Sequence, residues 1–215
     1  LEALRTARLQ EIHADIQSLV HDPGRVGSVR GHIDRLWRTA SVVRDRISID
    51  SWKVLARVRR DSLSGRTSPR SLSARVADVL PHLDTLIFDL SAFAGLGTES
   101  MTRGPGWRFL DMGRRVERAS SAIQLLSAAL AAPRSQIFPD GMRIDAPRVE
   151  EMLLEIADSS MTYRNRYPGV LEAAPLIDLL VIDETNPRSI GFQLAALAEH
   201  VEALPADAAS PVLSG

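Results

Sequence analysis

Apolar residues recur three and four positions apart along almost the whole chain, and this spacing constrains the fold more than any other feature. The first such stripe consists of Leu9, Ile12, Ile16 and Leu19. Intervals of three and four residues place side chains on one face of an α-helix, whereas a half-buried strand needs strict alternation. We find no convincing pair of strand-like segments joined by a hairpin turn. The sequence therefore predicts an all-α fold, a single multi-helix bundle with kinked long helices.

Glycine, proline and polar clusters divide this pattern into segments. Asp50 or Ser51 is expected to cap the third helix, and Pro81 is expected to kink or divide a long fourth helix. The expected helical ranges are 9–19, 33–47, 52–58, 72–93, 107–130, 149–167, 176–182 and 190–204. Residues 95–106 are expected to break the chain, and residues 133–147 to be mostly loop. We expect one bundle domain over residues 1–205 and a flexible tail over 206–215.

Composition excludes several classes of function. Net charge is −1 and aromatic residues make up 5% of the chain, so neither an electrostatic footprint nor a stacking platform for nucleic acid is indicated. The absence of Cys excludes disulfides and thiolate sites. No run reaches the roughly 18 apolar residues of a membrane span, the best candidate being residues 175–182. We therefore expect no membrane or nucleic-acid partner and a cytoplasmic location.

The chain does not begin with Met and shows no signal-peptide pattern at its start. We therefore expect a fragment, or the tail of a longer protein. Lys53 is the only lysine, and every other cationic side chain apart from histidine is arginine. A GC-rich genome explains this bias. The alternative is selection for two-pronged pairing with carboxylates or phosphates, which arginine performs better than lysine.

The densest polar segment of the chain is residues 183–189, just before the last helix. Asn186 and Pro187 form a good helix start, and Asp183 and Glu184 would lie near the positive end of that helix. One interpretation is simply a well-capped turn. Arg188 is not required by a cap, so the alternative is that the acidic residues and Arg188 hold a ligand or tie this turn to another helix.

A second polar cluster covers residues 113–119. On a helical wheel Phe109, Met112, Val116 and Ile123 share one face and Glu117 lies at its edge. A carboxylate at the edge of the core needs a cation or donors from another helix. Gly113 would leave room for close approach of another backbone. Arg114 and Arg118 lie further round the helix, so the alternative is a solvated arginine–glutamate ladder.

A third cluster ends the helix before residue 168 and contains Tyr163, Arg164, Arg166 and Tyr167. Two tyrosines and two arginines suit an anion or a carboxylate partner. The alternative is that the arginines meet the negative end of the helix while the tyrosines pack at its rim.

Motifs for metal, nucleotide and nucleophilic chemistry are missing from the sequence. The five histidines lack the His-Glu-x-x-His spacing of zinc proteases and the Glu-x-x-His spacing of di-iron bundles. Neither a P-loop nor a Gly-x-Ser-x-Gly elbow occurs. We therefore expect no cofactor and no metal.

In their order, these clusters resemble the alpha-E domain family of bacterial helical domains. The matching segments are residues 43–48 with Trp52, 93–96 with 99–101, 107–119, 160–167 and 183–190. The last two segments are the most specific, and the resemblance extends over roughly residues 30–205. Family members usually open with a helix bearing a Tyr-Trp-Leu-Gly-Arg-Tyr-like run followed by Glu-Arg-Ala, and the start of this chain does not match that run.

The resemblance implies an association with circularly permuted ATP-grasp ligases, either as separate companions or as fused C-terminal parts. Transglutaminase-like proteins are often encoded nearby, which suggests a peptide or amide-bond-forming system. The leading hypothesis is an accessory domain that binds an ATP-grasp-type ligase or its anionic peptide substrate. Its candidate binding residues are Arg114, Arg118, Tyr163, Arg164, Arg166, Asp183, Asn186 and Arg188.

Two further hypotheses stay open at this point. The first is an enzyme in which Glu117 and Glu184 act as general acid and base while arginines hold an anionic substrate, which requires those side chains to converge in one pocket. The second is a purely structural scaffold whose polar clusters form a buried network of ion pairs.

Overall fold

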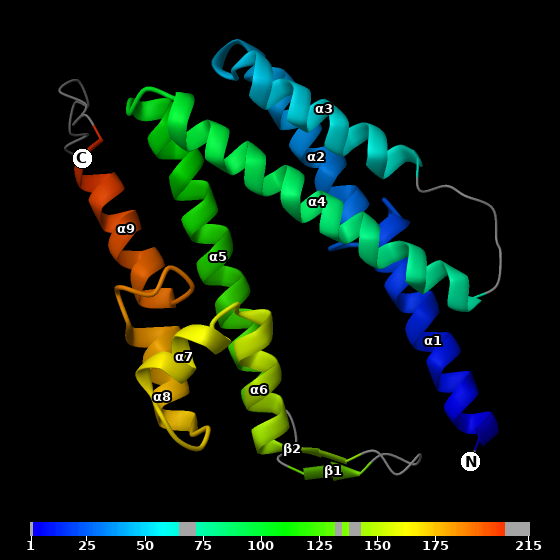
Figure 1. Ribbon diagram of the computed structural model, residues 1–215. Coiled ribbons are helices and arrows are strands. Elements are labelled where there is room, and N and C mark those ends of the chain that lie inside the picture. Colours follow the sequence, from blue (N-terminus) through cyan, green and yellow to red (C-terminus); the bar gives the residue numbers. More distant parts are fainter. Residues whose placement is uncertain (1, 65–71, 132–134, 138–142, 205–215) are drawn as a thin grey trace, which may run out of the picture. The chain divides into compact units, whose positions relative to one another are not determined.

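The computed structural model describes residues 2–64, 72–131, 135–137 and 143–204 of the chain (Figure 1). Its contacts group the chain into two compact units, Leu1–Thr102 and Arg103–Gly215, and each unit is described by itself. Helices dominate both units, which confirms the predicted all-α bundle class. The expected single domain over residues 1–205 stays a prediction, and the expected tail over 206–215 lies outside the described residues.

Unit 1 consists of helices packed around a small apolar core. Its elements are α1 (Glu2–His21), α2 (Val29–Val42), the 3₁₀ turn η1 (Arg44–Arg46), α3 (Ile49–Ser64) and α4 (Leu72–Ser100). Helix α3 packs against α2 and α4, and α1 also contacts these two helices. The centre of the core is formed by Ile33, Val54 and Val58.

Polar residues fix the helix starts in unit 1. Ser28 caps α2 by accepting a hydrogen bond from the backbone N–H of Gly31 at 3.1 Å. The hydroxyl of Ser48, directly before α3, accepts from the backbone N–H of Ser51 at 3.2 Å. The expected cap at Asp50 or Ser51 is therefore wrong, because Ser48 supplies the acceptor one turn earlier.

Helix α4 runs without division from Leu72 to Ser100, through Pro81 and past Gly95. The sequence places a break at Gly95, but the helix continues because packing of its apolar face outweighs the weak helix propensity of single glycines. An ion pair also fixes α4: Arg57 of α3 donates to Asp89 through Nε at 2.8 Å and Nη2 at 2.5 Å. Two parallel N–H···O bonds of this kind define the register between the helices.

Within α4, the stretch Val79–Ser100 is the one part of the described chain long and apolar enough to cross a membrane. This test uses length and composition alone, and buried core helices pass it too. The candidate expected from the sequence, residues 175–182, is too short for the same test.

Unit 2 contains the polar clusters singled out above. Its elements are α5 (Pro105–Ala131), β1 (Ser135–Ile137), β2 (Arg143–Asp145), α6 (Ala146–Ile156), α7 (Ser160–Arg166), α8 (Ala173–Ile177), the π-helical turn η2 (Asp178–Ile182) and α9 (Ile190–Glu202). Helices α5 and α9 lie side by side (Figure 1). The antiparallel pair β1–β2 was not predicted, because three-residue strands are too short to show alternation.

The orientation of α5 differs from the sequence expectation. Of the four residues of the expected core face, Phe109, Val116 and Ile123 are exposed by 50% or more, and Met112 is partly buried. The buried positions of α5 are Asp111, Ala119 and Leu126 instead. An apolar stripe identifies a helix face but not its partner, and α5 turns its other face toward α6 and α9.

The expected helix over residues 149–167 is divided into α6 and α7. At the division, Asp158 has a φ of +49°, a left-handed conformation that ends a helix. Ser159 follows with its side chain fully buried. The sequence did not reveal this break, because the segment contains neither glycine nor proline.

The core of unit 2 gathers apolar side chains from α5, α6, α7, α8 and η2. Its buried members are Leu126, Leu153, Leu154, Tyr163, Leu176, Leu179 and Leu180. The start of α9 lies very close to the end of η2, since a Cβ added at Gly191 would be 2.5 Å from the carbonyl oxygen of Ile182. Only glycine permits this approach.

We therefore predict that Gly191→Ala destabilises the protein by about 1–3 kcal/mol, because the methyl group forces α9 away from η2. The measurement is the free energy of unfolding in urea. Gly113→Ala is the matched control: a Cβ there meets nothing within 4 Å among the described residues, contrary to the expected close approach of another backbone. This exposed helical position should gain up to about 1 kcal/mol. Equal stability of Gly191→Ala and wild type would contradict the close packing.

Candidate functional site

The segment 183–189 is a compact turn between η2 and α9, and Ser189 is its helix cap. The Ser189 hydroxyl accepts a hydrogen bond from the backbone N–H of Phe192 at 2.9 Å and donates to the backbone carbonyl of Asp183. Ser189 is fully buried. The expected helix start at Asn186 and Pro187 is therefore wrong, because α9 begins at Ile190.

Asn186 has a different role, which explains why it is buried. Its side-chain amide donates to the carbonyl of Leu179 in η2 at 2.9 Å, and its side-chain oxygen accepts from the backbone N–H of Arg188 at 3.2 Å. The Gln193 side chain donates to the carbonyl of Pro187 at 2.6 Å. The turn thus satisfies its buried polar groups internally, which is what a buried irregular segment requires.

Asp183 faces α7 and pairs with Arg166. Arg166 donates through Nη1 to Asp183 and through Nη2 to the hydroxyl of Thr185 at 2.8 Å. The backbone N–H and hydroxyl of Thr185 also donate to Asp183, at 2.8 and 2.7 Å. Burial raises the pKa of Asp183, but the hydrogen bonds from Thr185 and Arg166 outweigh it and hold the pKa below its usual value.

The two tyrosines of the third cluster differ in their surroundings. Tyr163 is 3% exposed, accepts from the backbone N–H of Glu172 at 3.0 Å and belongs to the core of unit 2. Tyr167 donates its hydroxyl to Asp178 at 2.5 Å. That hydrogen bond and burial raise the pKa of Tyr167. Both hydroxyls are therefore engaged within the protein.

Arg188 points from the turn to the break between α6 and α7. Its Nη2 donates to the carboxylate of Asp158 at 2.6 Å. The left-handed conformation of Asp158 places its carboxylate there. The break between α6 and α7, which the sequence did not predict, thus places Asp158 where it can pair with Arg188, one of the candidate residues from the sequence.

A pocket of about 330 Å³ lies beside Arg188 in unit 2. The pocket is lined by Glu117, Arg118, Ser121, Ala122, Leu125, Leu126, Ile156, Ala157, Leu180, Pro187 and Arg188. Its floor is apolar, and its charged groups are one carboxylate and two guanidinium groups. The pocket brings together three sequence-derived candidates that lie up to 71 positions apart, from Glu117 to Arg188.

The other candidates do not line this pocket. Glu184 is exposed, and Arg164 is exposed with its Nε donating to the carbonyl of Ser160 at 3.3 Å. Arg114 lies 3.8 Å from Asp111, its neighbour one turn earlier on α5. Arg166, Asp183, Asn186 and Tyr163 serve the turn and the core as described above. The binding roles proposed for these residues stay predictions.

Arg118 occupies an unusual electrostatic position. Although it remains accessible to solvent, desolvation lowers its pKa, and the nearby cations Arg115, Arg188 and Arg114 lower it further. Among the described residues, none of the carboxylates lies within ion-pair distance of its guanidinium group. Three cations therefore lie near Arg118, whereas Glu117 is the one carboxylate among the residues that line the pocket.

A polar network between α5 and α9 was missed by the sequence analysis. Asp111 accepts from Arg115 Nε at 3.0 Å and lies 2.8 Å from His200 Nε2. Arg115 also donates to Gln193 at 3.2 Å. Arg108 approaches the other ring nitrogen of His200 at 3.4 Å, so that Nδ1 is the acceptor and Nε2 the donor to Asp111. The spacing of Asp111 and Arg115 by four residues was a readable signal, but their α9 partners were not.

The network keeps Asp111 ionised. Burial raises its pKa, whereas the hydrogen bond from His200 and the neighbouring Arg115 outweigh burial and hold the pKa below 3.8, its usual value. In the described part of the chain, acidic residues and histidines form no group of three that could hold a metal ion.

We predict that Asp111→Asn lowers the free energy of unfolding at pH 7 by about 1–2 kcal/mol, because Arg115 and His200 lose a charged partner. A carboxyl whose folded pKa is depressed stabilises the fold above pH 3.8, and this contribution disappears as pH falls through the lower, folded-state pKa. Acid unfolding followed by circular dichroism should therefore be less steep in the variant. Asp50→Asn, on an exposed pair with Lys53, is the control. Identical acid limbs for wild type and Asp111→Asn would contradict this account.

Comparisons with known proteins agree with this architecture. The family model of Alpha-E, described as a predicted alpha-helical domain with a conserved ER motif, matches residues 2–214. This chain contains Glu-Arg once, at Glu117-Arg118, and both side chains line the pocket. No solved structure matches the chain significantly.

Among curated proteins, two mycobacterial relatives are similar to this chain. They are the uncharacterised protein Rv2567 of Mycobacterium tuberculosis and the uncharacterised protein Mb2597 of Mycobacterium bovis, each 32% identical over 197 residues. The matched region is 90% of this chain and 21% of each relative, so the chain spans about a fifth of their length. With nearly its whole length matched, the chain belongs to the Alpha-E family.

Proposed function

We propose that this domain is an accessory binding module that holds the carboxylate end of a peptide in the unit 2 pocket and thereby supports an ATP-grasp-type amide ligase. The observation that carries the proposal is that Arg118 lies close to three other arginines, has no ion-pair partner among the described residues, and lines a pocket with several apolar residues. A carboxylate placed there would relieve the repulsion among neighbouring guanidinium groups and form charge-assisted hydrogen bonds.

The remaining lining residues suit a peptide better than a simple inorganic anion. Leu125, Leu126 and Leu180 offer apolar surface for a side chain. Glu117 supplies one negative charge, which favours a ligand that carries an amino group as well as a carboxylate. The volume of about 330 Å³ fits one or two amino-acid residues.

An accessory role is favoured over catalysis by the pocket's composition. Glu117 is the single carboxylate among the lining residues, whereas a general acid and base pair needs two titratable groups around the reacting atoms. The curated relatives are about five times longer than the matched region, which suits a domain that works beside others. The resemblance to partners of ATP-grasp ligases supplies the proposed partner class.

We predict that Arg118→Ala weakens binding of a dipeptide with a free amino group and a free carboxylate, such as Leu-Ala, by about 10- to 100-fold, since a charge-assisted hydrogen bond contributes about 1.5–3 kcal/mol. Isothermal titration calorimetry on the 215-residue chain measures this effect. The same dipeptide with a C-terminal amide should bind weakly to wild type and variant alike. Arg164→Ala is the matched control, because Arg164 is exposed and outside the pocket.

The proposal fails if the acid and the amide bind equally, or if Arg164→Ala matches Arg118→Ala. The proposed association with an ATP-grasp-type ligase is tested separately, by measuring the affinity of the wild-type chain for the ATP-grasp-type protein of the same organism. Absence of any complex would overturn the proposed partner while leaving the peptide site intact.

A structural scaffold is the second candidate function, favoured by the ion pairs Arg166–Asp183 and Arg188–Asp158 between the turn and its neighbours. We predict that Arg188→Ala lowers Tm by only a few degrees, because its pair is largely exposed. Differential scanning calorimetry checks this. If the domain is a scaffold, Arg188→Ala should lower Tm strongly and should not affect peptide binding separately. If the domain is a binding module, Arg188→Ala should weaken binding of the dipeptide at temperatures where the variant is fully folded.

A further inference from the structure

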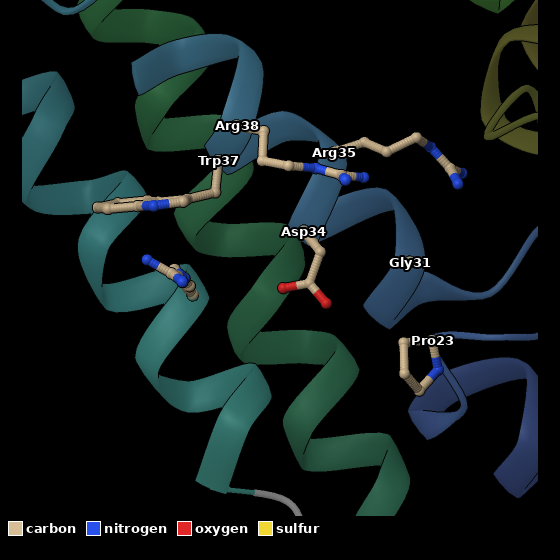
Figure 2. A pocket seen from close by; sticks show the side chains of 7 residues that line it. Pro23, Gly31, Asp34, Arg35, Trp37 and Arg38 are labelled. Atoms are coloured by element: carbon tan, nitrogen blue, oxygen red, sulfur yellow. The ribbon is translucent and has the colours of Figure 1, made fainter. Parts of the chain in front are cut away.

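Unit 1 contains a second pocket, of about 360 Å³, which has no part in the proposed peptide site. The pocket is lined by Pro23, Gly31, Asp34, Arg35, Trp37, Arg38 and Arg59. Helix α2 contributes most of the wall, Pro23 comes from the turn before it, and Arg59 comes from α3. Figure 2 shows Arg35 and Arg38 extending in the same direction from α2, while Trp37 points toward α3.

Positive charge in this pocket is not neutralised from within the protein. Asp34, its only acidic lining residue, already accepts from Arg30 Nε at 3.0 Å. Arg30 is held in turn by the carbonyl of Ser62 at 2.7 Å. In the described part of the chain, no carboxylate pairs with Arg35, Arg38 or Arg59. Three arginines therefore line a pocket whose one acidic lining residue, Asp34, is already paired with Arg30.

Arg59 provides an independent sign of a missing ligand. Its guanidinium lies 4.6 Å from the Trp37 ring centre, which holds it in place. Its Nε is buried and, among the described residues, is the one buried side-chain nitrogen or oxygen without a hydrogen-bond partner. A covered N–H without an acceptor costs about 1–3 kcal/mol, so Arg59 Nε has the capacity to donate to an acceptor that enters the pocket, a water or an anion.

The rest of the pocket is also suited to an anion. Its lining includes Gly31 in the first turn of α2, a 14-residue helix whose N-terminal backbone dipole is positive. At Gly31 a Cβ would lie 3.0 Å from Ser28 Oγ and 3.3 Å from the carbonyl of Pro23, so glycine keeps this end of the pocket open. Trp37 is stacked between Arg59 and Trp52, whose ring centre is 4.5 Å away, and so positions the cation.

We propose that unit 1 binds a phosphate group at this site, as carried by a small phosphomonoester. Arginines bind phosphate oxygens with two parallel N–H···O bonds, and Arg35 and Arg38, which extend in the same direction from α2, suit a dianion with several terminal oxygens. A single carboxylate would leave most of the charge unmatched. The volume of about 360 Å³ exceeds the needs of inorganic phosphate alone and leaves room for a small organic group.

The test is an NMR titration of the 215-residue chain with inorganic phosphate, glycerol 3-phosphate and malonate. The indole N–H signal of Trp37 should shift saturably with both phosphates, more tightly with the ester, while that of Trp107 in unit 2 stays constant. Arg35→Ala/Arg38→Ala should raise Kd at least tenfold. These two side chains have no partner in the described structure, so their loss should not affect folding.

Two controls make the result specific. Arg46→Ala/Lys53→Ala removes the same number of exposed cations from unit 1 and should change Kd less than twofold. Arg118→Ala should leave phosphate binding unchanged, which separates this site from the peptide site of unit 2. A linear, non-saturating shift or equal losses in both double variants would overturn the site. Malonate binding as tight as glycerol 3-phosphate would overturn the assignment to phosphate.

Discussion

Unit 2 depends on the close approach of the start of α9 to the end of η2. Gly191 allows the helix to approach the carbonyl of Ile182, and Ser189 then caps α9 while its hydroxyl holds the Asp183 carbonyl. This contact forces the chain between them into a short turn in which Asn186 and Ser189 are buried. Because buried polar groups need hydrogen-bond partners, the side chains of Asn186 and Gln193 donate to carbonyls of η2 and of the turn. The π-helical geometry of η2 is common where a helix is adapted to such a constraint.

The same turn determines which charges face the pocket. Asp183 is turned toward α7 and neutralised by Arg166, so it does not reach Arg118. On α5, Asp111 serves Arg115, His200 and, at longer range, Arg114. Asp158 is taken by Arg188. Each nearby aspartate is therefore engaged by a cation other than Arg118, which leaves Glu117 as the one carboxylate among the residues that line the pocket. Local arrangement rather than composition creates the binding potential.

Periodicity predicted the helices well, because a three- and four-residue spacing reports directly on helical faces. It could not say which face each helix buries. Phe109, Val116 and Ile123 form a clear stripe and yet are exposed, while Asp111 on another face is buried. The residues of the pocket were partly foreseen, since Glu117, Arg118 and Arg188 stood out as polar groups in excess of local need. The convergence of these residues depends on Asp158, whose left-handed conformation has no local sequence signal. It also depends on Ser189, rather than Asn186, capping α9. Both outcomes are decided by tertiary packing.

The abundance of arginine gains a physical meaning from these contacts. If the bias reflected composition alone, the guanidinium groups would be solvated cations that lysine could replace. Instead, Arg57 donates two hydrogen bonds to the carboxylate of Asp89. Cations also lie over the rings of all three tryptophans, 4.3–4.7 Å from their centres: Arg59 over Trp37, Arg44 over Trp52 and Arg103 over Trp107. A lysine could supply the charge at each place, but neither the flat stacking surface nor the paired donors. Whatever the origin of the bias, the fold uses the planar shape of arginine, and arginines line both pockets.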